Sequence, residues 1–215
     1  EKCDALNAYK FVSLEYRSAN GTNLKVGLID KAKFISGKKS TADGKYFNPN
    51  IPTEECFTTP KKGEAEGIAY AVKPLSYGGE LIENFWIRFE KGRAVACGAE
   101  KNEALLKSII AMDEGAAYLG ECALVPYDSP INRCGVLFYN TLFDENACCH
   151  LALGRGYSNT IENFADYMKS DFIEMGVNDS DIHVDFMIGA EDLEVTGVTA
   201  DGERVAVFRN GTWAI

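Results

Sequence analysis

The stretch Ile182-His183-Val184-Asp185-Phe186-Met187-Ile188 carries apolar side chains at every second position. Side chains alternate between the two faces of a β-strand, so Ile182, Val184, Phe186 and Ile188 would share one face and pack on a core. His183 and Asp185 would then point together to the opposite face. A histidine and a carboxylate in this arrangement can hold one divalent ion, although a surface histidine beside a surface aspartate gives the same pattern. The stretch therefore predicts a strand with one core face and one polar face.

Strand patterns dominate the rest of the chain, and helical patterns are few and separated. Helical spacing of apolar residues occurs at 102–112 and 160–175, and residues 1–9 are typical of the end of a helix. Residues 41–60 are rich in Gly, Asn, Pro and Thr and are expected to form a long ordered or functional loop. Because no βαβ unit recurs, the pattern predicts an α+β fold of one domain, with a largely antiparallel or mixed sheet and a few flanking helices. The other predicted strands are 10–17, 24–29, 67–72, 81–89, 122–125, 135–139, 193–198 and 204–208.

Composition restricts the possible partners. With 215 residues, of which 46% are hydrophobic, the chain can bury a substantial core. The 32 acidic and 22 basic residues give a net charge of -10, which argues against nucleic acid and anionic membranes as partners. The acidity fits a cation-binding protein and also fits an ordinary acidic surface. No apolar run approaches the roughly 20 residues that span a bilayer, and no basic leader opens the sequence, so we expect a soluble cytoplasmic protein.

The cysteines indicate reduced thiols in a cytosolic core. Their number is odd, their spacing is irregular and no CxxC motif occurs, which disfavours a structural zinc knuckle or a thioredoxin-like site. Cys149-His150 also suggests a thiol nucleophile with its base, but adjacent residues rarely point at each other, so this interpretation is disfavoured. The seven cysteines are Cys3, Cys56, Cys97, Cys122, Cys134, Cys148 and Cys149.

Several carboxylates occur where a lone charge would be costly. Glu121 lies near the start of an apolar strand pattern, and burying an unpaired carboxylate costs several kcal/mol. Glu145 and His150, the second of the two histidines, flank a stretch of small residues that allows close backbone approach. Glu54 and Glu55 lie in a loop whose shape is restricted by two prolines. Each of these glutamates needs a cation, a hydrogen-bonding partner or exposure to solvent.

Four segments, taken in order and with their approximate spacing, resemble the sequence blocks of the thermophilic-type metallo-aminopeptidases of peptidase family M29. The resemblance runs from Gly21 to Trp213. Members of this family are about twice as long and carry an N-terminal α/β domain, so the resemblance implies that residues 1–215 are the C-terminal catalytic half, in agreement with the first residue being Glu and not Met. The segments are Asn50-Ile51-Pro52-Thr53-Glu54-Glu55, Leu119-Gly120-Glu121-Cys122-Ala123-Leu124-Val125-Pro126, Asn140-Thr141-Leu142-Phe143-Asp144-Glu145-Asn146 and His183-Val184-Asp185-Phe186-Met187-Ile188-Gly189.

The resemblance also implies roles for single residues. Glu121 would bridge two divalent ions, Glu54 would act as general base or support the ligands, and Tyr157 would stabilise the oxyanion. It implies homodimers and peptide substrates with a free N-terminus. Oxygen-rich ligation with two imidazoles suits Zn, Co or Mn, and four carboxylates balance the charge of two divalent ions. The metal ligands would be Glu55, Glu121, Glu145, His150, His183 and Asp185.

Two other functions compete with a self-sufficient aminopeptidase. The chain could be a metal-binding and dimer-forming part that is inactive without the remaining half of the protein. A calcium-dependent binding domain would use the same carboxylates, but imidazole is a poor ligand for this hard ion and no EF-hand spacing occurs.

Overall fold

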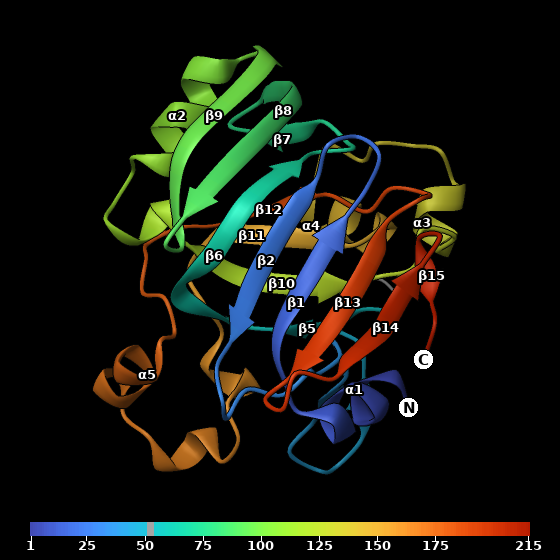
Figure 1. The fold of residues 1–215 in the computed structure, drawn as a ribbon, viewed down its shortest axis with the longest axis vertical. Coiled ribbons are helices and arrows are strands. Elements are labelled where there is room, and N and C mark those ends of the chain that lie inside the picture. Colours follow the sequence, from blue (N-terminus) through green and yellow to red (C-terminus); the bar gives the residue numbers. More distant parts are fainter. Residues whose placement is uncertain (51–53) are drawn as a thin grey trace.

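Two antiparallel sheets contain most of the strands in the computed structural model, which describes residues 1–50 and 54–215. The larger sheet forms the front of the molecule in Figure 1. Its strands follow the order β15 (Thr212–Trp213), β14 (Arg204–Arg209), β13 (Glu194–Thr199), β1 (Phe11–Arg17), β2 (Asn23–Leu28), β6 (Pro60–Tyr70), β8 (Glu80–Glu90) and β7 (Leu75–Tyr77), with β9 (Arg93–Lys101) paired to β8.

The smaller sheet lies behind the larger one, and its strands cross those of the larger sheet in the view of Figure 1. The two sheets enclose the main core. Phe85 of β8 packs against Phe186 in the smaller sheet, with ring centroids 6.0 Å apart, and Tyr16 of β1 is fully buried in the same cluster. One face of the smaller sheet is therefore packed against the core, and its other face is not part of the core. The smaller sheet contains β12 (His183–Met187), β11 (His150–Gly154), β10 (Leu119–Leu124) and β5 (Cys56–Thr58).

Short helices cover the edges of the sheets. Leu106 and Ile109 anchor the second helix in the core, as its amphipathic pattern predicts. Among the described residues, no helix combines the length and the apolar character that crossing a bilayer requires. The helices are α1 (Lys2–Tyr9), α2 (Glu103–Ile110), α3 (Pro130–Arg133), α4 (Thr141–Asp144) and α5 (Lys169–Met175), and the single-turn 3-10 helices are η1 (Gly115–Ala117), η2 (Glu145–Ala147), η3 (Ser158–Thr160) and η4 (Phe164–Asp166).

The α+β class with a largely antiparallel sheet is confirmed, because every strand pair of the described residues is antiparallel. Of residues 41–60, those that the structure describes (41–50 and 54–60) contain only the two-residue strand β4 (Tyr46–Phe47), β5 and the first residue of β6. The two-residue strand β3 (Lys39–Ser40) lies just before them and pairs with β4. The strands predicted at 10–17, 24–29, 67–72, 81–89, 122–125, 193–198 and 204–208 correspond to β1, β2, β6, β8, β10, β13 and β14.

Two local predictions are wrong. No strand forms at 135–139, because the carboxylate of Asp144 accepts hydrogen bonds from the backbone N–H groups of Phe138 and Asn140 and thereby satisfies them locally. The helical pattern of 160–175 is interrupted, since Tyr167 has extended backbone angles between η4 and α5. In both segments, local backbone geometry overrides the apolar spacing.

Candidate metal centre

The outer face of the smaller sheet carries ionisable side chains in register. Glu121 of β10 pairs with Ala152 of β11, which pairs with Asp185 of β12. Directly paired residues of antiparallel strands point to the same side, so both carboxylates flank the small methyl group of Ala152. His150 and His183 lie two residues before Ala152 and Asp185 and therefore share this face. The prediction that His183 and Asp185 point the same way is confirmed, with His183 Nε2 3.3 Å from Asp185 Oδ1.

The opposite face of the same strands belongs to the core. Leu151, Val184 and Phe186 are buried there. Cys149 joins this core, and its thiol lies 3.4 Å from the carbonyl oxygen of Val125. Alternation along the chain thus separates Cys149 from the neighbouring imidazole of His150, which argues against a thiol nucleophile at this pair.

Two loop glutamates complete the cluster. Glu55 lies immediately before β5 and is buried, with its Oε1 3.0 Å from His150 Nε2. Glu145 opens η2, and its Oε1 accepts a hydrogen bond of 2.9 Å from the side chain of Asn50. The contribution of Asn50 was not predicted, although this residue opens the block that contains Glu55. The six side chains expected to bind metal therefore lie together.

The cluster divides into three groups of possible ligands whose donor atoms lie within 4.8 Å of one another. Glu121, His150 and Asp185 each belong to two of these groups, and a carboxylate shared in this way can bridge two ions. Among the described residues, the buried Oδ1 atom of Asp185 is approached only by His183 Nε2, at 3.3 Å, and a cation could take the place of that proton. The donors fit a divalent metal well in type and in number. The groups are Glu55, Glu121 and His150; Glu121, His183 and Asp185; and Glu145, His150 and Asp185.

Backbone carbonyl groups orient both imidazoles. His183 Nδ1 lies 2.7 Å from the carbonyl oxygen of Arg155, and His150 Nδ1 lies 3.2 Å from that of Cys148. A carbonyl oxygen only accepts, so it favours the tautomer with hydrogen on Nδ1. Nε2 then carries the lone pair that a metal needs. Both Nε2 atoms face carboxylates of the cluster.

The buried carboxylates hold protons more tightly than exposed ones do. Burial raises the pKa of Glu121 to about 7, against the opposing effect of its contact with His183. Burial also raises the pKa of Glu145 to about 8, and the negative charge of Asp185 adds to this effect. Mutual repulsion and low polarity thus disfavour the fully ionised cluster in the absence of cations.

For the two imidazoles, contact with carboxylates outweighs the effect of burial on the pKa. Burial alone would lower their pKa values, but contact with Glu55 raises the pKa of His150 to about 10. Asp185 and Glu121 together raise the pKa of His183 to about 11. At neutral pH without metal, both rings are therefore protonated and act as internal counter-ions. A metal that binds here must displace these protons.

Tyr157 follows β11 and reaches the same cluster. Its hydroxyl oxygen lies 3.2 Å from His183 Nε2, and its backbone N–H donates a 2.8 Å hydrogen bond to the hydroxyl oxygen of Thr59. Burial raises the pKa of the Tyr157 phenol, which keeps it protonated and able to donate. A cavity of about 240 Å³ is lined by Tyr157, Glu55, Glu121 and Glu145, whereas the neighbouring Glu54 is exposed.

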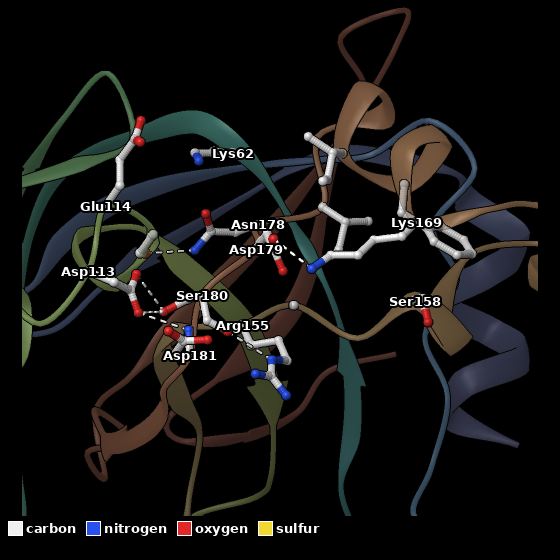
Figure 2. Close-up of a pocket in the computed structure, with 15 residues that line it drawn as sticks. Lys62, Asp113, Glu114, Arg155, Ser158, Lys169, Asn178, Asp179, Ser180 and Asp181 are labelled. Atoms are coloured by element: carbon white, nitrogen blue, oxygen red, sulfur yellow. Dashed lines mark hydrogen bonds and ion pairs between the residues drawn. The ribbon is translucent and has the colours of Figure 1, made fainter.

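A second cavity, of about 780 Å³, borders the segment that leads from β11 to Tyr157 (Figure 2). Its charged side chains mostly contact one another or the backbone. Lys169 forms a 2.8 Å ion pair with Asp179, and Arg155 Nε donates to the carbonyl oxygen of Ser180. Most charged side chains of the second cavity therefore already have a partner in the protein, whereas in the first cavity several carboxylates lie close together.

Residues 1–213 match the family described as thermophilic metalloprotease (M29). The chain belongs to this family. Family M29 is a metalloprotease family, so a divalent metal at the cluster agrees with membership.

Relatives in family M29 are named as aminopeptidases. Aminopeptidase AmpS of Bacillus subtilis (strain 168) is 49% identical over 214 residues, which cover 100% of this chain and 52% of the relative. Aminopeptidase T of Thermus aquaticus is 45% identical, with 98% of this chain and 51% of the relative covered. The chain thus spans about half the length of the curated relatives it matches.

Two solved structures share the fold of this chain. Wild-type AmpT from Thermus thermophilus superimposes with a TM-score of 0.93 at 43% identity, covering 100% of this chain and 52% of that one. A 2,5-dihydroxypyridine dioxygenase from Pseudomonas putida KT2440 has a TM-score of 0.64 at 16% identity and covers 99% of this chain and 58% of its own. At that identity the likeness shows a shared fold alone.

Proposed function

We propose that this chain is the metal-binding catalytic half of a metallo-aminopeptidase that removes the N-terminal residue from peptides. The observation that carries the proposal is the cluster of six candidate ligand side chains, three of which line one cavity, in a chain whose family relatives are named aminopeptidases. The free N-terminus of a peptide is a cation at neutral pH. A carboxylate of the acidic site can bind this cation, which favours an exopeptidase.

We propose two divalent ions, of Zn, Co or Mn, bound by the six side chains, with Glu121 as the bridging ligand. Support comes from four carboxylates whose charge two divalent ions would balance, and from Glu121, which like Asp185 is shared between two ligand groups; the family resemblance selects Glu121 of the two. When bound, such ions activate a water molecule and polarise the scissile carbonyl group. The core face of the smaller sheet holds the ligands of β10, β11 and β12 in place.

The remaining roles belong to the protein's own side chains. Tyr157 donates its phenolic hydrogen to the oxygen on which negative charge develops. Glu54 accepts the proton of the attacking water or supports Glu55 from the same loop. Asn50 orients Glu145 through its amide N–H.

Replacing Tyr157 by Phe is expected to lower kcat by about 100- to 1000-fold, because one donor to the oxyanion is lost. Metal content should remain that of the wild type, since the phenol is not one of the ligands. Steady-state kinetics and elemental analysis of the same samples provide the measurement. Tyr46 is exposed, and Tyr46→Phe serves as the matched control. Loss of metal in Tyr157→Phe would mean that Tyr157 supports the ligands and does not serve the oxyanion.

The proposed activity is tested on chelator-treated protein reloaded with Zn, Co or Mn. Metal content is measured together with hydrolysis of a chromogenic amino-acid amide, and an N-acetylated amide serves as the control. Close to two ions per chain with hydrolysis of the free amine only would support the proposal. Two ions without hydrolysis would favour the alternative, a metal-binding part that needs the remaining half of the protein. Failure to bind any of these metals would contradict the ligand set.

We also propose that the protein functions as a homodimer in the cytoplasm. The homodimer follows from the resemblance to family M29, and sedimentation at several concentrations tests it. The compartment is supported by seven free cysteines, which fit a reducing environment.

A further inference from the structure

Two thiols outside the metal cluster face each other between α1 and the smaller sheet. The Sγ atoms of Cys3 and Cys56 lie 3.0 Å apart, although the residues are 53 positions apart in sequence. Within the described part of the chain, no other two cysteines are in hydrogen-bonding contact. A disulfide has an S–S distance of about 2.05 Å, so an approach of about 1 Å would join them.

The backbone segments that carry Cys56 and Cys3 differ in how firmly they are fixed. Cys56 belongs to β5 and pairs with Leu124 of the central strand β10, so its backbone is fixed within a sheet. Helix α1 buries only Leu6 among its own residues. Apart from the contact of Cys3, its side-chain hydrogen bonds to the rest of the chain come from Lys2, which donates to the carbonyl oxygen of Ile215, and from Asn7. A small shift of α1 can therefore close the gap while the sheet stays in place.

The two thiols also differ in access to an oxidant. Cys3 is half-buried, whereas Cys56 is 4% exposed. Their contact lowers the pKa of the Cys3 thiol and raises that of the Cys56 thiol, so Cys3 is the thiol of the pair that ionises first. By contrast, burial raises the pKa of the Cys122 and Cys148 thiols. A small oxidant therefore reaches Cys3 first, and Cys56 lies in place to react with the product.

We propose that Cys3 and Cys56 form a reversible redox site that responds to peroxides. The Cys3 thiolate attacks one peroxide oxygen, the O–O bond breaks, and a sulfenic acid forms; with hydrogen peroxide, one water is released after protonation. The Cys56 sulfur then displaces hydroxide from the Cys3 sulfur, which forms the disulfide and releases a second water. Two thiols are oxidised by two electrons in total and the peroxide is reduced. A low-molecular-weight thiol restores both cysteines by exchange.

The disulfide would tie α1 to the strand that follows Glu55. Closing a loop of 53 residues restricts the unfolded chain, so the oxidised form is expected to have a Tm higher by about 5–10 °C. The fixed sheet would retain its register because β5 need not move. The disulfide would therefore hold α1 covalently against β5, next to the metal cluster.

The test treats the metal-free chain with a small excess of hydrogen peroxide, so it does not depend on the proposed function. Peptide mapping without reduction should recover one linked peptide that contains Cys3 and Cys56 and has lost two hydrogen atoms, and dithiothreitol should reverse it. The rise in Tm should disappear in Cys3→Ser and persist in Cys134→Ser, whose thiol is exposed. A map with Cys3 oxidised to sulfinic acid beside a free Cys56 thiol would overturn the proposal. Equal Tm shifts in Cys3→Ser and wild type would do the same.

Discussion

Replacing Glu121 by Gln is expected to abolish high-affinity metal binding and to lower aminoacyl-amide hydrolysis by more than about 100-fold. Loss of a residue that only supports a ligand already costs about 10- to 100-fold in metal affinity or activity, and Glu121 is a proposed ligand that belongs to two of the three groups. The amide removes a negative charge and presents a hydrogen-bond donor to the metals. Elemental analysis and kcat/KM on the same preparation measure both effects.

The fold of Glu121→Gln should survive, which makes the loss interpretable. Since burial raises the pKa of Glu121 to about 7, the metal-free fold loses stability as pH rises from the ordinary glutamate pKa of about 4.5, and this loss is complete above about 7. Metal-free Glu121→Gln is therefore expected to be more stable than wild type at pH 8, by about 1–3 kcal/mol. Glu83→Gln changes an exposed ion pair with Lys101 and serves as the control. Wild-type metal content and turnover in Glu121→Gln would refute the bridging role.

Stabilisation by Co²⁺ is expected to be much larger at pH 8 than at pH 5.5. The pKa values of His150 and His183 are raised to about 10 and 11, so their protonated forms stabilise the metal-free fold. This contribution is complete below the ordinary histidine pKa of about 6.5 and is lost as pH rises through about 10 and 11. Metal must displace these protons, so affinity rises by about tenfold per pH unit for each proton released.

Thermal scans with and without Co²⁺ at the two pH values measure this difference. Calorimetry in buffers of different ionisation enthalpy counts the protons released on binding. His183→Gln should release fewer protons than wild type, because one imidazole is absent. A Tm increase from Co²⁺ that is equal at pH 5.5 and pH 8 would show that protons and metal do not compete at the cluster.

The parts of the structure that could be predicted are those in which local pattern and tertiary environment agree. Strand β12 has one apolar and one polar face, so both its conformation and the common direction of His183 and Asp185 followed from the sequence alone. Strand β11 was missed because its residues are buried on both faces and show no alternation. An apolar run of five residues does not distinguish a strand from other buried structure.

The loop contributions could not be predicted from local pattern. Glu55 was selected among candidates only through the family resemblance, since nothing in the loop sequence distinguishes it from Glu54. The contact between Asn50 and Glu145 joins residues 95 positions apart and depends on how two loops meet. The roles of the six proposed ligands are predictions that the metal-binding experiments above test.

The strict alternation along β12 has a consequence for how the chain can change over time. Exchange of Val184 or Phe186 for another apolar residue of similar volume alters packing on one side only and leaves His183 and Asp185 in position. Insertion or deletion of one residue within the strand would instead turn the ionisable side chains toward the hydrocarbon interior and the apolar ones toward the cavity. Homologous strands should therefore vary in composition on their inner side while keeping the same number of residues between their ends.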